Sequence, residues 1–284
     1  MVVRKRFGQH FLHDPAVIRR IMDAVAPSCA ERIVELGPGR GALTWGLLER
    51  AAELTVIEID RDLAASLERD ARANARLRVL VGDMLEVDFE RLRAGGAASA
   101  DGPLPPVREL RPEATKLRIV GNLPYNISTP ILFHLLRQRD AIADMHLMVQ
   151  KEVADRMVAE PGSKQYGRLT VMLAAYADVE KLFEVGPGAF QPRPKVWSAM
   201  VRVRPSLEPR FSIGGDAVLK SLVSAAFSHR RKTLRNGLKA LMSSQDIETC
   251  GIDPRLRPES LTPEGFGRLA TRLSQLAGMA RHGG

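Results

Sequence analysis

From Arg32 onward, short apolar runs alternate with amphipathic helical patterns, and this alternation limits the possible folds more than any other feature of the chain. Such an order is typical of βα units, in which helices connect the strands of a parallel sheet. The sequence therefore predicts an α/β fold with a doubly wound sheet. Strands are expected at Arg32–Leu36, Leu54–Ile59, Leu77–Val81, Leu117–Val120, Met145–Val149, Val179–Val185 and Ala199–Val203. Helices are expected at Ala42–Arg50, Asp62–Ala73, Pro130–Arg137, Lys151–Ala159 and Arg168–Ala177.

Two stretches rich in Gly and Pro interrupt this alternation. Arg93–Lys116 separates the third expected strand from the fourth, and we expect it to be a surface insertion outside the functional site. Pro205–Gly215 separates the sheet from a part in which only helices are expected. We therefore predict a sheet domain at 1–207 and a small all-helical domain at 208–284. The helices expected in the second domain are Asp216–Phe227, Lys232–Leu241 and Pro263–Leu276.

The chain is basic, because its 42 Lys and Arg residues exceed its 33 Asp and Glu residues and give a formal net charge of +9. Nucleic acid is the first anionic partner to consider, although a basic surface that only maintains solubility fits the charge equally well. Cys29 and Cys250 are far apart, and the six histidines form no metal-binding pattern. Since no long apolar run is present either, we expect a soluble, cytoplasmic protein with no membrane contact and no metal site.

The segment IVELGPGRGALTWGLL, Ile33–Leu48, has the pattern of a strand, a glycine turn and the start of a helix. Gly37, Gly39 and Gly41 allow the backbone to approach a ligand closely at the helix N-terminus. The same spacing loosely matches the dinucleotide fingerprint, so a nicotinamide or flavin nucleotide also fits this loop alone.

The next two strands end on acidic residues. Glu58, or Asp60 as a second choice, is placed to accept hydrogen bonds from the ribose hydroxyls of a bound adenosine. Asp83 is placed to accept from an adenine amino group, although it could instead cap the following helix. Glycine, acid and acid at three successive strand ends fit a Rossmann-like S-adenosylmethionine-dependent methyltransferase sheet better than a hydride-transfer enzyme. The expected cofactor is S-adenosyl-L-methionine, with S-adenosyl-L-homocysteine as its product.

The fourth strand delivers Asn122-Leu123-Pro124-Tyr125 to the same edge of the sheet. The amide oxygen of Asn122 and the carbonyl of Leu123 could each accept one hydrogen of an adenine N6 and hold its lone pair toward the donor methyl. Pro124 restricts the preceding residue to extended backbone, and Tyr125 offers a ring for base stacking, worth about 1–3 kcal/mol. The alternative is a strand-to-helix turn with Asn as a cap and Pro as a stiffener. Alignment at this corner requires no metal.

Taken together, these motifs resemble the bacterial 16S rRNA adenine N6,N6-dimethyltransferase family. The similar stretches are Arg4–Asp14, Val34–Thr44, Val56–Ala64, Gly121–Leu136, Met148–Met157, Ala189–Arg202 and Ala226–Asn236. The resemblance implies dimethylation of two adjacent adenosines in the loop of the 3′-terminal hairpin of 16S rRNA, within the immature 30S subunit during late assembly. It implies donor binding by His10, Leu12, Gly37, Glu58, Asp83 and Asn122, and catalysis by the residues from Asn122 to Tyr125.

The resemblance also implies that Phe190 sandwiches the target base against Tyr125, although both aromatics could be core residues. His10 stands where the family usually has Asn, so a side-chain amide contact to the donor is replaced by imidazole or lost. We expect a monomer.

Contacts to RNA phosphates are expected from cations in three parts of the chain. In the last part, a helix over Lys232–Leu241 would carry a basic face, although a solvated charged face fits the same pattern. The expected RNA-binding residues are Arg4, Lys5, Arg6, Arg193, Lys195, Arg231, Lys232 and Arg235.

Three other functions share part of this pattern. Large-subunit rRNA dimethyltransferases are neighbours, but the HRRKT segment at 229–233 favours the small subunit. A DNA adenine methyltransferase would more often carry Asp-Pro-Pro-Tyr at the catalytic corner. A noncatalytic assembly or RNA-binding factor that retains the methyltransferase fold remains the alternative from another class.

Overall fold

The computed structural model describes residues 10–71, 74–95, 115–228 and 232–282. The chain divides into two compact units. The sheet unit comprises Met1–Ala154 and Glu180–Pro205, and the helical unit comprises Asp155–Val179 and Ser206–Gly284. The helical unit thus includes a segment that precedes the expected boundary at 207. Most of the expected insertion, residues 96–114, lies outside the described residues.

The central sheet has seven strands in the order β4-β3-β2-β5-β6-β9-β7. Neighbouring strands from β4 to β6 run parallel, whereas β9 runs antiparallel to β6. The carboxyl ends of β2 to β6 therefore meet at one edge, where open α/β sheets bind ligands. The expected strands are confirmed, with ends that shift by up to three residues. The strands are β2 Arg32–Leu36, β3 Glu53–Glu58, β4 Leu77–Val81, β5 Leu117–Asn122, β6 Ile142–Gln150, β7 Ala177–Val185 and β9 Ser198–Pro205.

A second, two-stranded sheet joins the two chain segments that make up the sheet unit. β1 (Phe11–Leu12) pairs antiparallel with β8 (Phe190–Gln191), so that Leu12 lies opposite Phe190. His13 N donates to Ala189 O at 2.9 Å and extends this pairing. The N-terminal segment is therefore held by residues about 180 positions later in the sequence.

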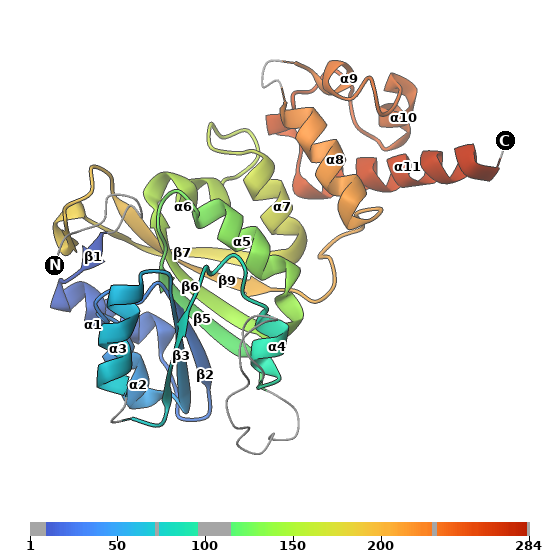
Figure 1. Ribbon diagram of the computed structural model, residues 1–284. Coiled ribbons are helices and arrows are strands. Elements are labelled where there is room, and N and C mark those ends of the chain that lie inside the picture. Colours follow the sequence, from blue (N-terminus) through green and yellow to red (C-terminus); the bar gives the residue numbers. More distant parts are fainter. Residues whose placement is uncertain (1–9, 72–73, 96–114, 229–231, 283–284) are drawn as a thin grey trace. The chain divides into compact units, whose positions relative to one another are not determined.

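Helices flank both faces of the central sheet, as Figure 1 shows for α1, α2 and α3 on one side and α4 and α5 on the other. Helix α1 was not expected from the sequence, although Asp14 caps it by accepting from Ala16 N at 2.8 Å and Pro15 is its first residue. The helices that begin in the sheet unit are α1 Pro15–Val25, α2 Thr44–Arg50, α3 Arg61–Ala71, α4 Phe89–Arg93, α5 Ser128–Arg137 and α6 Lys151–Met157, with short 3₁₀ helices at Arg139–Ala141 and Pro187–Ala189.

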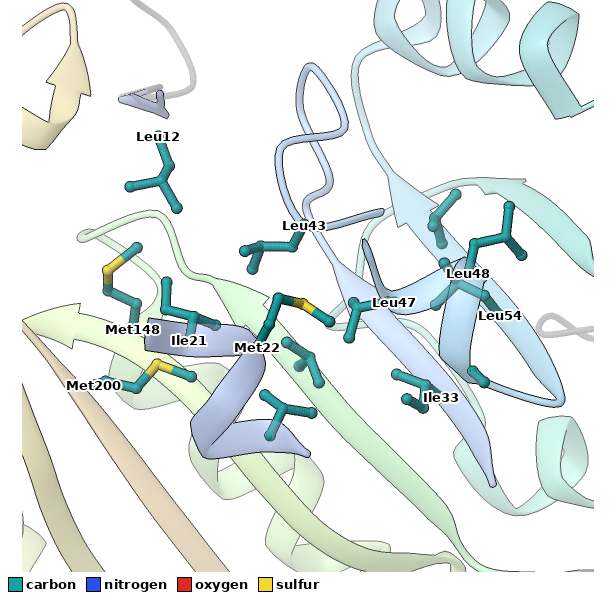
Figure 2. Close-up of a cluster of buried hydrophobic side chains, with 14 of the residues drawn as sticks. Leu12, Ile21, Met22, Ile33, Leu43, Leu47, Leu48, Leu54, Met148 and Met200 are labelled. Carbon is teal, nitrogen blue, oxygen red and sulfur yellow. The ribbon is translucent and has the colours of Figure 1, made fainter. Parts of the chain in front are cut away.

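A hydrophobic core lies between α1, α2 and the central strands (Figure 2). Ile21 and Met22 of α1, Leu47 of α2, Ile33 of β2 and Met148 of β6 all belong to this core. Side chains on one face of a strand recur every second residue, so the alternating apolar pattern directs one set toward these helices. Because α1 and β1 both contribute to this core, burial of apolar surface holds the N-terminal segment against the sheet.

In the helical unit, α7, α8 and α11 contact one another. The rings of Tyr166, Phe227 and Phe266 form a continuous aromatic cluster, and Tyr166 donates to Leu261 O at 2.8 Å. A Cβ at Gly267 would lie 2.3 Å from Ser212 O, so glycine permits this close approach of α11. The helices are α7 Arg168–Tyr176, α8 Asp216–Phe227, α9 Leu234–Gly237, α10 Ser244–Thr249 and α11 Pro263–His282, with a 3₁₀ helix at Pro258–Ser260.

The expected helix over Lys232–Leu241 is wrong, because α9 covers only Leu234–Gly237. Two backbone amides at its start are used elsewhere: Leu234 N donates to Leu256 O at 2.8 Å and Arg235 N donates to Pro254 O at 3.0 Å. These tertiary hydrogen bonds override the local helical pattern. The basic residues near α9 therefore do not share one continuous helix face.

His146 is a buried ionisable side chain in the middle of β6. Its side chain is 1% exposed, and neither ring nitrogen has a hydrogen-bond partner among the described residues. Burial lowers its pKa to about 4, the negative charge of Asp144 opposes this shift, and the cations Arg118, Arg202 and Arg204 add to it. The folded protein therefore holds a neutral imidazole where the unfolded chain would bind a proton below pH 6.5.

We predict that His146 makes the protein less stable as the pH falls from about 6.5 toward 4. A folded-state pKa below the unfolded value gives stability that is complete above the unfolded pKa and is lost during acidification. The free energy of unfolding of the wild type, relative to His146→Leu, should drop by about 2 kcal/mol between pH 7 and pH 5. Urea denaturation at several pH values measures it. The exposed His13→Gln serves as the control, and parallel curves for wild type and His146→Leu would contradict the prediction.

Candidate active site

A cavity opens at the carboxyl edge of the sheet and is lined by residues from β1, β2, β3, β5 and the turns that follow them. It brings together most of the site residues expected from the sequence. Asp83 and Phe190 are expected site residues that do not line it. The expected residues in its lining are His10, Leu12, Gly37, Glu58, Asn122, Leu123, Pro124 and Tyr125.

The glycine turn after β2 needs glycine for two reasons. Gly37, Gly39 and Gly41 have φ values of +64°, +59° and +81°, in the left-handed region that strains other residues. A Cβ at Gly39 would also lie 3.0 Å from the ring of Phe11. The guanidinium of Arg40 stands 4.6 Å from the centre of the same ring. The N-terminal segment therefore packs directly on the turn and closes one side of the cavity.

Glu58 fixes the shape of this turn. Its Oε2 accepts from Gly39 N at 3.0 Å and its Oε1 accepts from Asp60 N at 3.0 Å. Burial raises the pKa of Glu58, and the two backbone hydrogen bonds oppose that shift. Each carboxylate oxygen has a second lone pair, which leaves acceptor capacity for the hydroxyls of a ribose. Asp60, the second choice, instead caps α3 by accepting from Asp62 N at 3.0 Å.

Asp83 lies just after β4, outside the cavity lining. Its Oδ1 accepts from Leu85 N at 2.9 Å and closes a local turn. Asp83 does not cap the following helix, which was the alternative, because Asp88 caps α4 by accepting from Arg91 N at 2.8 Å. The neighbouring Met84 does line the cavity, and its Cε would be 3.6 Å from a Cβ at Gly37. The contact of Asp83 with an adenine amino group stays a prediction.

The corner formed by Asn122, Leu123, Pro124 and Tyr125 depends on a close approach between β5 and β2. A Cβ at Gly121 would lie 2.8 Å from Leu36 O, so no side chain fits there. Asn122 follows, and its Nδ2 donates to His10 O at 3.0 Å, which fixes the orientation of the amide. Within the described part of the chain, no group donates to Asn122 Oδ1. An acceptor is therefore held at the cavity wall.

The next three residues are held by hydrogen bonds to β6, α5 and β9. Leu123 N donates to Met148 O at 3.0 Å, and Pro124 O accepts from the hydroxyl of Ser128 at 3.1 Å. The hydroxyl of Tyr125 is hydrogen-bonded to Ser198 Oγ at 2.9 Å, which sets the direction of its ring. This corner is therefore rigid before a substrate arrives, as a positioning site requires.

His10 uses its imidazole to hold the N-terminal segment in place. Its Nδ1 donates to the carbonyl of Pro192 at 2.7 Å, and its ring centre lies 5.4 Å from that of Tyr125. His10 thus makes a contact to the polypeptide itself, in addition to lining the cavity.

Phe190 is 2% exposed and belongs to the hydrophobic core shown in part in Figure 2. This position matches the alternative considered for it, that of a core residue. Its stacking against a target base stays a prediction, and it would require the side chain to leave the core.

Sequence reasoning missed Glu35, which is 2% exposed and lines the cavity. Thr44 Oγ1 donates to its Oε2 at 2.7 Å. Burial raises its pKa to about 7, the bond from Thr44 opposes the shift, and the charge of Glu58 adds to it. The available signal was an acidic residue inside an otherwise apolar strand, two positions before the first glycine.

The expected RNA-binding cations lie in both units. Arg193 and Lys195 are exposed in the sheet unit, and Lys232 and Arg235 are exposed in the helical unit. Arg231 and the cations at 4–6 lie outside the described residues.

The glycine turn, the buried carboxylate that braces it and the Asn-Leu-Pro-Tyr corner share one cavity at the carboxyl edge of the sheet. This arrangement defines the class of the S-adenosylmethionine-dependent methyltransferases. The family model for ribosomal RNA adenine dimethylase matches residues 2–275. The chain belongs to that family.

Relatives and solved structures agree with this assignment. The chain is 48% identical over 275 residues to ribosomal RNA small subunit methyltransferase A of Pseudomonas aeruginosa, covering 97% of this chain and 96% of the relative. It is 50% identical over 266 residues to the protein of the same name from Nitrosococcus oceani, covering 93% of each. The crystal structure of the 23S rRNA methyltransferase ErmE covers 93% of this chain and 99% of its own, with a TM-score of 0.65 and 27% identity.

A dimethyladenosine transferase from Plasmodium falciparum shares the fold, with a TM-score of 0.69 at 23% identity over 96% of this chain and 98% of that one. Across the described ranges, no three or more His, Cys, Asp and Glu side chains gather into a group that could hold a metal ion. Those ranges also contain no helix that is long and apolar enough to cross a membrane.

We predict that Glu58→Gln weakens donor binding on the order of tenfold, because the amide nitrogen would face a backbone N–H donor of Gly39 or Asp60 and leave it unsatisfied. Titration calorimetry with S-adenosylmethionine measures the dissociation constant. Glu53→Gln, at the opposite end of the same strand, should bind the donor like the wild type. Unchanged affinity in Glu58→Gln would show that this carboxylate does not brace the donor site.

Proposed function

We propose that the protein dimethylates N6 of two adjacent adenosines in the loop of the 3′-terminal hairpin of 16S rRNA, with S-adenosylmethionine as donor. The observation that carries the proposal is that Asn122 and the glycine turn line the same cavity. Its close relatives are named as methyltransferases of small-subunit ribosomal RNA, which supports the choice of substrate.

The chemistry of the cavity lining supports this donor. Glu58 would accept the ribose hydroxyls, and the positive-φ turn from Gly37 admits the amino-acid moiety close to the backbone. Glu35 adds a second carboxyl group beside a ligand that carries positive charge. When bound, the donor supplies an electrophilic methyl group on a cationic sulfur.

The chain contributes alignment to the reaction. Asn122 Oδ1 and the Leu123 carbonyl would accept the two N6 hydrogens and turn the lone pair of the nitrogen toward the methyl group. Tyr125 would hold the plane of the base from one side, since its hydroxyl is fixed by Ser198. Loop adenines suit this site because unpaired bases can be turned out of a stack at small cost. No side chain needs to act as a strong base.

The proposed substrate is the immature 30S subunit. The protein would act on it as a monomer in the cytoplasm and without a metal ion. A noncatalytic assembly factor is the alternative, and dimethylation of large-subunit rRNA is the neighbouring enzymatic one. Labelled donor offered in parallel to immature small subunits, large subunits and DNA, followed by nucleoside mass spectrometry, separates these functions. We expect N6,N6-dimethyladenosine only with small subunits, whereas donor binding without transfer to any substrate would favour the assembly factor.

We predict that Asn122→Ala lowers the rate of methyl transfer at least a hundredfold, because one of two acceptors for N6 is lost. The measurement is single-turnover transfer to immature subunits. Donor affinity is determined alongside, since Asn122 also lines the donor cavity. Asn126→Ala removes an exposed amide from the same turn and should react like the wild type. A near-normal yield of dimethyladenosine in Asn122→Ala would refute the catalytic assignment.

We also predict that Lys232→Ala combined with Arg235→Ala weakens binding to the rRNA and reduces the slope of log K against log salt by about 1 to 2. Each phosphate contact that disappears removes the release of about one counterion. Filter binding over a salt series gives the slope. Lys220→Ala, an exposed cation of α8, is the control. If the double variant keeps the wild-type slope, these cations do not contact phosphates.

A further inference from the structure

The segment from Pro192 to Ser198, named here the edge loop, is held by hydrogen bonds to residues in and near the cavity. Pro192 O accepts from His10 Nδ1 at 2.7 Å, and Trp197 O accepts from Lys151 N at 2.8 Å. Ser198 Oγ is hydrogen-bonded to the hydroxyl of Tyr125 at 2.9 Å. Two of these anchors, His10 and Tyr125, are residues of the cavity. The position of the edge loop is therefore fixed relative to the catalytic corner.

The outer side of the edge loop carries cations and apolar groups together. Arg193 and Lys195 are exposed, whereas Pro194 between them is buried. Val196 is 42% exposed and Trp197 is 52% exposed. Isolated exposed apolar residues are common on protein surfaces. Here a large aromatic residue instead lies next to two cations on a loop whose backbone is held in place.

The backbone of Trp197 lies at the carboxyl edge of the parallel strands. Ser198 begins β9 and pairs with Gln150, the last residue of β6, so the preceding Trp197 lies at the carboxyl end of the parallel strands. Its six-membered ring is 3.7 Å from where a Cβ of Gly186 would be. One part of the indole thus rests on backbone while about half of the residue stays accessible.

Charge and shape together indicate what this surface would bind. The two cations favour an anionic partner, and a flat exposed ring favours a planar group. Single-stranded nucleic acid offers both, since its phosphates bind Lys and Arg while its bases stack on aromatic side chains. An unpaired loop leaves such bases free beside the target, whereas a paired helix does not.

We propose that Trp197 is a stacking platform for an unpaired base of the RNA near the target adenosine, with Arg193 and Lys195 contacting the phosphates beside it. This inference rests on the proposed RNA substrate and adds a residue that positions it. The platform would hold the loop in an opened form and thereby deliver the neighbouring adenosine to the Asn122 corner.

The first test compares Trp197→Ala with Trp197→Phe in the full-length protein. Trp197→Ala should raise both the dissociation constant and the KM for immature small subunits on the order of tenfold, because one stacked base is lost. Trp197→Phe should keep most of the affinity, and donor affinity and melting temperature should not change in either variant. Leu207→Ala, which removes another residue that is 51% exposed, is the control.

The second test separates stacking from a structural role. An RNA hairpin with two adjacent loop adenosines is prepared with an abasic site at one loop position at a time. At the position that stacks on Trp197, the abasic site should weaken binding to the wild type and have no further effect on Trp197→Ala. Equal losses in both proteins at every position would overturn the proposal, because no base would then depend on the indole.

The outcomes also distinguish this inference from the function on which it depends. If the wild type methylates no small subunit, the proposed function fails. If the wild type is active and Trp197→Ala binds RNA normally, only the platform is refuted. A loss of affinity for assembled subunits without any loss for protein-free rRNA would assign Trp197 to a ribosomal protein and would refute it as well.

Discussion

The absence of space at Gly121 is the constraint on which the site depends. A side chain there would collide with the backbone of Leu36, so β5 lies close against β2 only because residue 121 is glycine. That approach places the backbone oxygen of Asn122 within 3.9 Å of where a Cβ of Gly37 would be. The backbone of Asn122 and the glycine turn are thus neighbours through main-chain geometry. The distance between these two backbone segments is therefore set before any side chain contributes.

Glu35 and Glu58 are two buried carboxyl groups on adjacent strands, and their surroundings act differently on their pKa values. Glu58 receives hydrogen bonds from two backbone amides, which favour its charged form. Glu35 receives one from the hydroxyl of Thr44 and is more deeply buried, so its pKa lies near 7. A positively charged ligand in the shared cavity would favour ionisation of both.

Much of this architecture could be predicted from the sequence, because strands buried on both faces leave continuous apolar runs and their last residues must meet at one edge. The glycine turn, Glu58 and the Asn122 corner followed from that rule. The two-residue strands β1 and β8 are too short for any periodic signal, and their pairing depends on residues about 180 positions apart. The burial of Phe190 and the shortening of α9 likewise result from tertiary contacts. Glu35 was overlooked because nothing in the sequence indicates that a residue inside a predicted strand lines a cavity.

The pairing of β1 with β8 has a consequence for synthesis of the chain. The wall formed by His10, Phe11 and Leu12 is held by Ala189, Phe190 and Pro192, which leave the ribosome much later. Until those residues emerge, the glycine turn lacks its covering segment and Asn122 lacks the carbonyl that orients its amide. A nascent or truncated polypeptide that ends before this point has the strands of the donor site without its enclosure. The wall of this cavity is thus completed late in translation, after nearly the whole sheet unit has been made.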